Sequence, residues 1–115
     1  MFDFEKFEVY SKSKSFLGEI SSFIEAANGL NARIADQLYR AALSIPLNIA
    51  EGAGRYSKPD KRNFYTVARG SVFECTAIID ILQEKGILSK EKKAEYYNML
   101  EGLSKMLSGL INSLR

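Results

Sequence analysis

Apolar residues recur three and four positions apart along most of this chain, and no stretch of useful length alternates between apolar and polar residues. The first spacing places side chains on one face of an α-helix, whereas alternation is typical of a half-buried β-strand. Glycine, asparagine and serine stand where the pattern is interrupted. The sequence therefore predicts an all-α protein.

Two amphipathic helices are predicted in the first half of the chain. The first covers about Phe4 to Ala27 and ends at Asn28-Gly29, a pair suited to the left-handed backbone that follows a helix. The second covers about Ala32 to Gly52, with Asn31 as its N-cap. Pro46 falls inside the second helix, where proline removes a backbone hydrogen bond and crowds the preceding turn. We therefore predict a kink at Pro46.

Two more helices are predicted in the second half. Ser57, followed three residues later by Asp60, is similar to a capping box and begins the third helix, which ends at Gly86. Its buried face is expected to carry apolar and small residues at helical spacing: Phe64, Val67, Ala68, Ser71, Cys75, Ile78 and Leu82. Ser89 caps the fourth helix, whose apolar residues have the spacing of a helix-bundle seam: Tyr96, Leu100, Leu103, Leu107, Leu110 and Leu114.

Length and composition fit one compact domain. The chain has 115 residues, of which 46% are hydrophobic and 26% are charged, enough to bury a single core. Four helices joined by short connections pack most simply as an antiparallel up-down-up-down bundle. We therefore predict one four-helix-bundle domain over residues 1–115, kinked at Pro46 in its second helix.

Several functional classes are disfavoured by what the chain lacks. It contains no histidine and only one cysteine, Cys75, so we expect no metal site, no internal disulfide, no cofactor and no catalytic residues. No run approaches the roughly 20 apolar residues that span a bilayer, and the N-terminus lacks the basic and then apolar order of a signal peptide. We expect a cytoplasmic protein with no membrane contact.

Basic residues are concentrated in the middle of the chain. Between residues 55 and 69, five of them stand against Asp60 alone, a local net charge of +4 in a chain of net charge +2. Guanidinium groups suit phosphate oxygens, and Tyr56, Phe64 and Tyr65 lie nearby for stacking on unpaired bases. We therefore predict a nucleic-acid-binding surface made of basic side chains on the second and third helices: Arg33, Arg40, Arg55, Lys58, Lys61, Arg62 and Arg69.

Polar and small residues on the same two helices need partners or a packing role. Asn48 falls where the core should be, so we expect its amide to bond across the bundle to Ser71, Glu74 or an arginine. Ala68, Gly70 and Ser71 make one face of the third helix small, which predicts the close approach of another helix.

Two alternatives follow from Glu51 and Glu74. Buried carboxylates need a cationic partner, and Arg40 or Arg69 could supply it, in which case the chain is a protein-interaction scaffold held by arginine–carboxylate pairs, without a specific nucleic-acid role. Two neighbouring carboxylates could also act as a general acid and base, which would make the chain an enzyme.

Two stretches resemble a known family. The residues QLYRAALSIPLNIAEGAG at 37–54, followed by Arg55, and DKRNFYTVARGSVFE at 60–74 look like the signature of the four-helix-bundle proteins of the 23S ribosomal RNA intervening sequence family. The resemblance covers nearly the whole chain, with departures at Lys61 and Asn63. The matching motif positions are Arg40, Pro46, Asn48, Glu51, Gly52, Arg55, Arg69, Gly70, Ser71 and Glu74.

This resemblance implies a small bacterial protein encoded in, or related to those encoded in, insertions within large-subunit ribosomal RNA genes. The family is similar to the accessory variability protein of diversity-generating retroelements, a basic homopentamer that engages a reverse transcriptase and nucleic acid. By resemblance we expect a homo-oligomer, a pentamer, that meets RNA or DNA, with a reverse transcriptase as a candidate partner. The residues expected to form a structural or interface motif are Pro46, Asn48, Glu51, Gly52, Gly70, Ser71 and Glu74.

Overall fold

The computed structural model describes residues 2–115. A 3-10 turn, η1 at Asp3–Lys6, precedes four helices, α1 at Glu8–Ala26, α2 at Ala32–Ala53, α3 at Lys58–Glu84 and α4 at Lys90–Ser113. Within these residues no β-strand is present. The predicted all-α class with four helices is confirmed.

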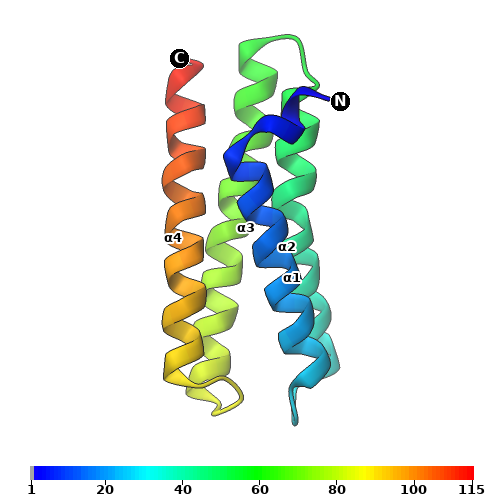
Figure 1. The fold of residues 1–115 in the computed structure, drawn as a ribbon, viewed down its shortest axis with the longest axis vertical. Helices are drawn as coiled ribbons and strands as arrows, with labels where there is room; N and C mark the ends of the chain where they lie inside the picture. The colour runs from blue at the N-terminus through cyan, green and yellow to red at the C-terminus, as the bar shows by residue number, and fades with distance from the viewer. Residues whose placement is uncertain (1) are drawn as a thin grey trace.

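The four helices pack side by side in an elongated bundle with extents of 44 × 23 × 21 Å. In Figure 1 the chain descends along α1, rises along α2, descends along α3 and rises along α4, so consecutive helices run in opposite directions. Helices α1 and α3 each contact both α2 and α4. Both termini and the connection between α2 and α3 consequently lie at one end of the bundle.

The caps of α2 and α3 lie where the sequence predicts them. The side-chain oxygen of Asn31 accepts a hydrogen bond from the backbone N–H of Arg33 at 2.8 Å, and Ser57 Oγ accepts one from the N–H of Asp60 at 3.2 Å. Such bonds satisfy N–H groups that have no partner within the helix. Local sequence therefore determines where these two helices begin.

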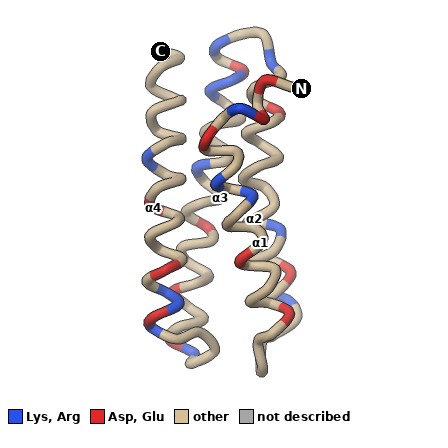
Figure 2. The backbone as a smooth tube through the Cα atoms, in the orientation of Figure 1, with Lys and Arg blue, Asp and Glu red and all other residues tan. Residues whose placement is uncertain are grey.

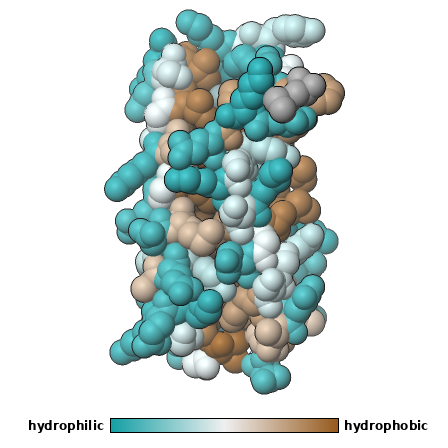
Figure 3. Space-filling view, in the orientation of Figure 1, coloured by the Kyte–Doolittle hydropathy of each residue, from teal (hydrophilic) through white to brown (hydrophobic). Residues whose placement is uncertain are grey.

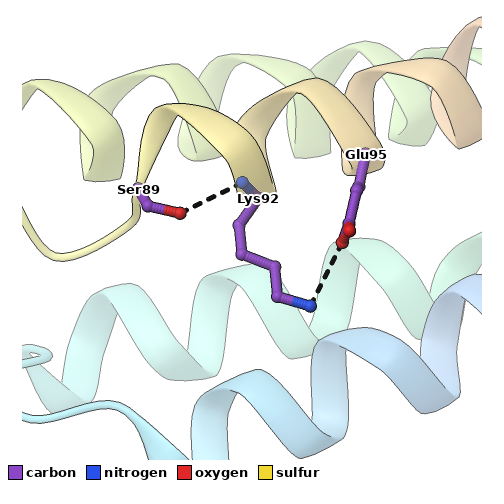
Figure 4. Close-up of polar contacts among 3 residues, drawn as sticks. All are labelled: Ser89, Lys92 and Glu95. Atoms are coloured by element: carbon purple, nitrogen blue, oxygen red, sulfur yellow. Dashed lines mark hydrogen bonds and ion pairs between the residues drawn. The ribbon is translucent and has the colours of Figure 1, made fainter.

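The start of α4 follows the same rule (Figure 4). Ser89 Oγ accepts a hydrogen bond from the backbone N–H of Lys92 at 3.1 Å, and the ammonium group of Lys92 donates to Glu95 at 3.1 Å. Gly86, with φ of +77°, allows the chain to turn between α3 and α4. The predicted N-cap of the fourth helix is confirmed.

The first helix begins later than predicted. It starts at Glu8 rather than Phe4, because the extended backbone of Phe7 separates η1 from α1. The ring of Phe4 still packs edge-on against Tyr10, with ring centroids 4.8 Å apart. Because Phe4 packs against Tyr10 of α1, the helical spacing of apolar residues continues across Phe7. The spacing therefore gave no sign that the helix is interrupted there.

Helix α2 contains the predicted proline and ends one residue after the predicted stop. Pro46 and Gly52 are both buried, and Gly52 lies inside the helix. A Cβ atom added at Gly52 would lie 2.8 Å from the ring of Tyr65 on α3. Glycine therefore allows the end of α2 to approach α3 closely, while the kink at Pro46 stays a prediction.

The core runs along the bundle axis and draws on all four helices. Its largest fully buried side chains are Phe16, Ile20, Leu38, Ile45, Ile49, Ile79, Leu82, Leu100, Leu103 and Leu107. Of the seam predicted for the fourth helix, Leu110 and Leu114 are only half-buried. The apolar seam of α4 is therefore less completely buried toward the end that holds the termini.

The buried face predicted for the third helix is partly wrong. Ala68, Ser71, Cys75 and Leu82 are buried as predicted, but Val67 is 46% exposed, and Phe64 and Ile78 are only half-buried. The remaining buried positions belong to Tyr65, Val72 and Ile79. Helix α3 has apolar residues on nearly every side, so spacing alone does not determine which side faces the core.

Candidate nucleic-acid interface

A short connection between α2 and α3 lies at the end of the bundle that holds the termini (Figure 1). The N–H of Gly54 donates to carbonyls of the last turn of α2, and α3 begins after the Ser57 cap with Pro59 in its first turn. Proline fits there because the first N–H groups of a helix have no intrahelical acceptor. The connection is thus fixed at both ends and exposes Arg55 and Tyr56.

Five basic residues lie at this end and form what we call the basic cluster: Arg55, Lys58, Lys61, Arg62 and Arg115. Figure 2 shows basic positions along the α2–α3 connection and the start of α3. Acidic residues of η1 lie at the same end, but η1 packs against α1 and α2. The positive charge of the cluster therefore lies along the α2–α3 connection and the start of α3, and continues to the end of α4 at Arg115.

Two members of the basic cluster cap the C-termini of other helices. The ammonium group of Lys61 donates to the carbonyl of Ala53 at 3.0 Å, and the guanidinium of Arg62 donates to the carbonyl of Leu114 at 2.7 Å. Cations stabilise these carbonyls, which carry the partial negative charge of the helix end. A carbonyl is not an anion, so both side chains keep their formal charge and have further N–H groups for a phosphate.

An open cleft of about 630 Å³ lies between the start of α3 and the end of α4. It is lined by Pro59, Arg62, Asn63, Thr66, Ile111 and Arg115. The cleft offers two guanidinium groups, an amide and a hydroxyl, which are the groups that contact phosphate oxygens in nucleic-acid complexes. Sequence reasoning missed Arg115, although its place directly after the seam residue Leu114 puts it beside the start of an antiparallel third helix.

Arg55 makes two contacts within its own surroundings. Its guanidinium lies 3.4 Å from the carboxylate of Glu51, one turn earlier, and 4.6 Å from the centroid of the Phe64 ring. Its side chain is 44% exposed and that of Glu51 is 57% exposed, and such surface pairs contribute about 0–1 kcal/mol. Because the pair is weak, a phosphate can compete with Glu51 for Arg55.

The three aromatic residues predicted to stack on bases differ in their surroundings. Tyr56 is fully exposed, at 102% of its reference area, whereas Tyr65 is buried at the contact with α2. Burial raises the pKa of the Tyr65 hydroxyl. The guanidinium of Arg55 covers one face of Phe64. Of the three, Tyr56 alone has both ring faces open to solvent.

Arg69 lies outside the basic cluster, further along α3. Its Nε donates to Ser108 Oγ on α4 at 3.0 Å, and its guanidinium lies 4.8 Å from the ring centroid of Phe73. It pairs with neither Glu51 nor Glu74, so the predicted pairing of Arg69 with a carboxylate is wrong. Serine is a neutral acceptor, and Arg69 forms no ion pair with any carboxylate of the described residues.

Arg33 and Arg40 lie toward the other end of the bundle. Arg40 pairs with Asp36 at 3.1 Å rather than with Glu51 or Glu74, and Arg33 is exposed in the first turn of α2. At 1.5 Å per residue, Arg33 lies about 30 Å along the helix from the end of α2. The seven predicted residues therefore do not form one surface, since only Arg55, Lys58, Lys61 and Arg62 share the basic cluster.

Asn48 bonds within its own helix, contrary to the prediction that its amide crosses the bundle directly. Its Nδ2 donates to the carbonyl of Ser44 at 2.8 Å and to Ser44 Oγ at 2.9 Å. Ser44 Oγ in turn shares a hydrogen bond of 2.8 Å with Ser71 Oγ on α3. Ser44, which the sequence analysis did not single out, thus connects two motif residues across the α2–α3 interface.

Glu51 and Glu74 are both exposed and have separate partners. Glu51 pairs with Arg55, and Glu74 accepts a hydrogen bond from the amide of Gln37. Glu51 directly precedes Gly52, which lies against Tyr65 of α3. Glu74 is nine residues beyond Tyr65, which is about 13 Å along the helix at 1.5 Å per residue. Neither carboxylate is buried, and the two are too far apart to share one reacting group.

The outer face of α3 is unusually apolar. Val67, Phe73 and Ile81 are 46%, 55% and 45% exposed, and the exposed residues Gly70 and Ala77 lie between them at helical spacing. A Cβ atom added at Gly70 would have no neighbour within 4 Å. Gly70 therefore does not serve the packing of this single chain, and we call these five residues the outer stripe of α3.

An apolar groove lies between the start of α1 and the end of α4. It is lined by Phe7, Glu8, Val9, Met106, Gly109, Leu110 and Ser113, with a volume of about 360 Å³. Figure 3 shows hydrophobic side chains at the surface beside this end of α4. The molecule therefore exposes apolar surface on two of its sides.

Neither a metal-binding group nor a membrane-spanning helix is found in the described chain. Residues 2–115 contain no cluster of three histidine, cysteine, aspartate or glutamate residues able to hold a metal ion. None of the helices within the same range has the length and apolar character needed to cross a membrane.

Comparison with known proteins places this arrangement in context. The family model described as 23S rRNA-intervening sequence protein matches residues 5–109. A crystal structure from Bacteroides thetaiotaomicron VPI-5482, described as a protein with unknown function from the S23 ribosomal protein family, is similar in fold. It has a TM-score of 0.83 and 23% sequence identity, and the match covers 90% of this chain and 97% of that one. No curated protein matches the chain.

Proposed function

Since the chain belongs to the 23S rRNA-intervening sequence protein family, we propose that it is a non-enzymatic, oligomeric helical-bundle protein that binds RNA or DNA through its basic side chains. The observation that carries this proposal is the basic cluster beside the open cleft lined by Arg62 and Arg115. Phosphate contacts supply most of the affinity of proteins that bind nucleic acid without reading its sequence.

The internal contacts of the basic cluster are compatible with this role. Lys61 and Arg62 donate to neutral carbonyls, and Arg55 is held by one exposed carboxylate. Within residues 2–115, Lys58 forms no ion pair. The cluster therefore keeps most of its positive charge in the folded chain, and assembly of several copies would multiply it.

A salt titration tests the proposal. If six to ten phosphates are contacted by the assembly, affinity for RNA or DNA falls roughly 10³- to 10⁵-fold between 50 and 200 mM salt. Fluorescence anisotropy with a labelled oligonucleotide measures this slope. Binding that does not change with salt, or the absence of binding at low salt, would contradict the proposal.

A matched pair of variants assigns the binding to the basic cluster. Lys58 and Lys90 each follow a serine N-cap as the first residue of a helix, but these helices begin at opposite ends of the bundle. Glutamate is favourable at either position because it complements the helix dipole, so both variants should fold. Lys58→Glu is expected to weaken binding and flatten the salt slope, and Lys90→Glu should leave both close to those of the wild type.

Assembly is the second part of the proposal, and the outer stripe of α3 supports it. A soluble monomer seldom leaves a row of apolar side chains along one helix in contact with water. We place the contact between copies on this stripe, with five subunits expected from the family resemblance. Light scattering should give a multiple of the chain mass for the wild type and a smaller particle for the Val67→Lys, Ile81→Lys double variant.

A protein-interaction scaffold remains the alternative, and the Arg40–Asp36 and Arg55–Glu51 pairs favour it, because they show that arginines here do engage carboxylates. It predicts that reversal of Arg55, Lys58 and Lys61 to glutamate prevents assembly or partner capture, with little RNA affinity to lose. A reverse transcriptase stays a predicted partner, and co-purification with it from cells that express both proteins tests that expectation.

A further inference from the structure

We propose that the α2–α3 connection binds unpaired nucleotides by stacking a base on Tyr56, so that the bound nucleic acid is single-stranded at this point. The inference rests on the proposed function and names the form of nucleic acid that the basic cluster receives. It starts from the exposure of Tyr56, which at 102% is the highest among the exposed large hydrophobic residues of the described chain.

A fully exposed tyrosine among cations is well suited to this contact. Its ring packs against no other part of residues 2–115, and Arg55 and Lys58 are exposed on either side of it in sequence. A nucleobase placed on the ring gains stacking, while neighbouring phosphates reach the two cations. Stacking of this kind tolerates any base, because every base has a π-face.

The other two nearby aromatic residues are less accessible. Tyr65 is buried where a Cβ added at Gly52 would collide with it, and Phe64 is covered on one face by the guanidinium of Arg55 at 4.6 Å. Among the aromatic residues at 56, 64 and 65, Tyr56 is thus the one that offers both faces of its ring to a base.

The shape of the connection favours unpaired over paired nucleotides. In a duplex, base faces are already stacked on one another, so an exposed ring gains no base to stack on. The segment between Gly54 and Ser57 is short and fixed at both ends, and it presents a single ring rather than a helix for a groove. The cleft lined by Arg62 and Arg115 lies beside the start of α3, where the strand can continue.

The absence of tryptophan from the sequence gives a direct test. Tyr56→Trp keeps an aromatic ring and introduces a single tryptophan fluorophore. Titration with a short oligouridine should quench its emission through stacking, whereas a fully paired RNA duplex without a loop should not. Equal quenching by both RNAs, or none by oligouridine despite measured binding, would overturn the inference.

Removal of the ring provides the second measurement. Tyr56→Ala should lose about 5- to 150-fold in affinity for oligouridine at fixed salt, the usual effect of one stacking aromatic residue. Its salt slope should remain that of the wild type, because the phosphate contacts remain. Tyr39→Ala, which removes a tyrosine 42% exposed on α2, is the matched control and should bind as the wild type does.

Failure of the inference can be told apart from failure of the proposed function. If the wild type binds neither oligouridine nor the duplex at low salt, the proposed function itself is wrong. If both bind with a steep salt slope, but Tyr56→Ala loses nothing or the duplex binds more tightly, only the stacking inference is wrong.

Discussion

Gly52 is a residue whose small size the fold requires. It is buried at the end of α2, where an added Cβ would lie 2.8 Å from the ring of Tyr65 and 3.0 Å from the Cβ of Phe64. Tyr65 is itself buried, so its ring cannot move without disturbing other contacts. The motif glycine therefore determines how closely two helices approach, and through them the position of the basic cluster.

Gly52→Ala is expected to destabilise the protein by about 1–3 kcal/mol, because overpacking outweighs the better helix propensity of alanine. Urea unfolding followed by circular dichroism measures the free energy of unfolding. Gly18→Ala is the control, since Gly18 lies in α1 with no neighbour within 4 Å, and it should gain up to about 1 kcal/mol. Equal stabilities for the two variants would show that α2 and α3 adjust without penalty.

Cys75 should make stability depend on alkaline pH. Burial, with a smaller contribution from the charge of Glu74, raises the pKa of its thiol from 9.0 to about 12. The folded state therefore holds this proton more tightly than the unfolded state does. The contribution of this group to the free energy of unfolding is fully present below pH 9. It is lost between pH 9 and 12, by up to about 1.4 kcal/mol per pH unit.

Comparison with Cys75→Ala isolates this effect. Tyr65 and Tyr96 also have a raised pKa because of burial, so the wild type and the variant should both lose stability above pH 10. Between pH 9 and 10 the wild type should decline more steeply than Cys75→Ala. Parallel curves over that interval would mean that the thiol reaches water in the folded state.

At the scale of the helices, what could be predicted depends on whether the cause is local. The caps at Asn31, Ser57 and Ser89 bond to N–H groups two or three residues away, so the sequence alone indicates them. The side of α3 that faces the core depends on other helices, and the spacing that selected Val67 fits the exposed side as well. The partner of Asn48 was mispredicted for a similar reason. Ser44 lies one helical turn before Asn48 and is within reach of its amide, so a partner on another helix was not required.

The caps of α3 and α4 give a prediction at this scale. Ser57→Ala and Ser89→Ala should each lower the free energy of unfolding by about 1 kcal/mol, because each leaves an N–H at a helix start without its acceptor. Ser57→Ala should additionally loosen the connection that carries Tyr56 and so weaken oligonucleotide binding. Ser89→Ala, at the other end of the bundle, should leave binding unchanged.

At the scale of the whole molecule, the bundle separates two kinds of surface. The basic cluster lies at the end that holds the termini, and the outer stripe runs along the length of α3. The cluster depends on which helix ends meet, and Arg115 belongs to it only because α4 returns to the start of α3. The sequence indicates the local charge, but the tertiary arrangement spreads the predicted basic residues along the bundle.

Assembly through the outer stripe should make thermal stability depend on protein concentration. Only folded chains associate, so a higher protein concentration stabilises the folded state of an oligomer and raises its Tm. The Tm of a monomer does not depend on concentration in this way. The Val67→Lys, Ile81→Lys double variant should abolish this dependence. Ser22→Lys, at an exposed position of α1, is the control and should retain it.

Both chain ends emerge beside the basic cluster, and this affects how the protein should be handled (Figure 1). A purification tag or fluorescent fusion at the C-terminus would crowd Arg62 and Arg115 and mask oligonucleotide capture. Immobilisation through a cysteine introduced at the opposite tip, beside Gly29 or Gly86, would present the cluster outward from a sensor surface. The native thiol of Cys75 is buried and should not compete for the coupling reagent.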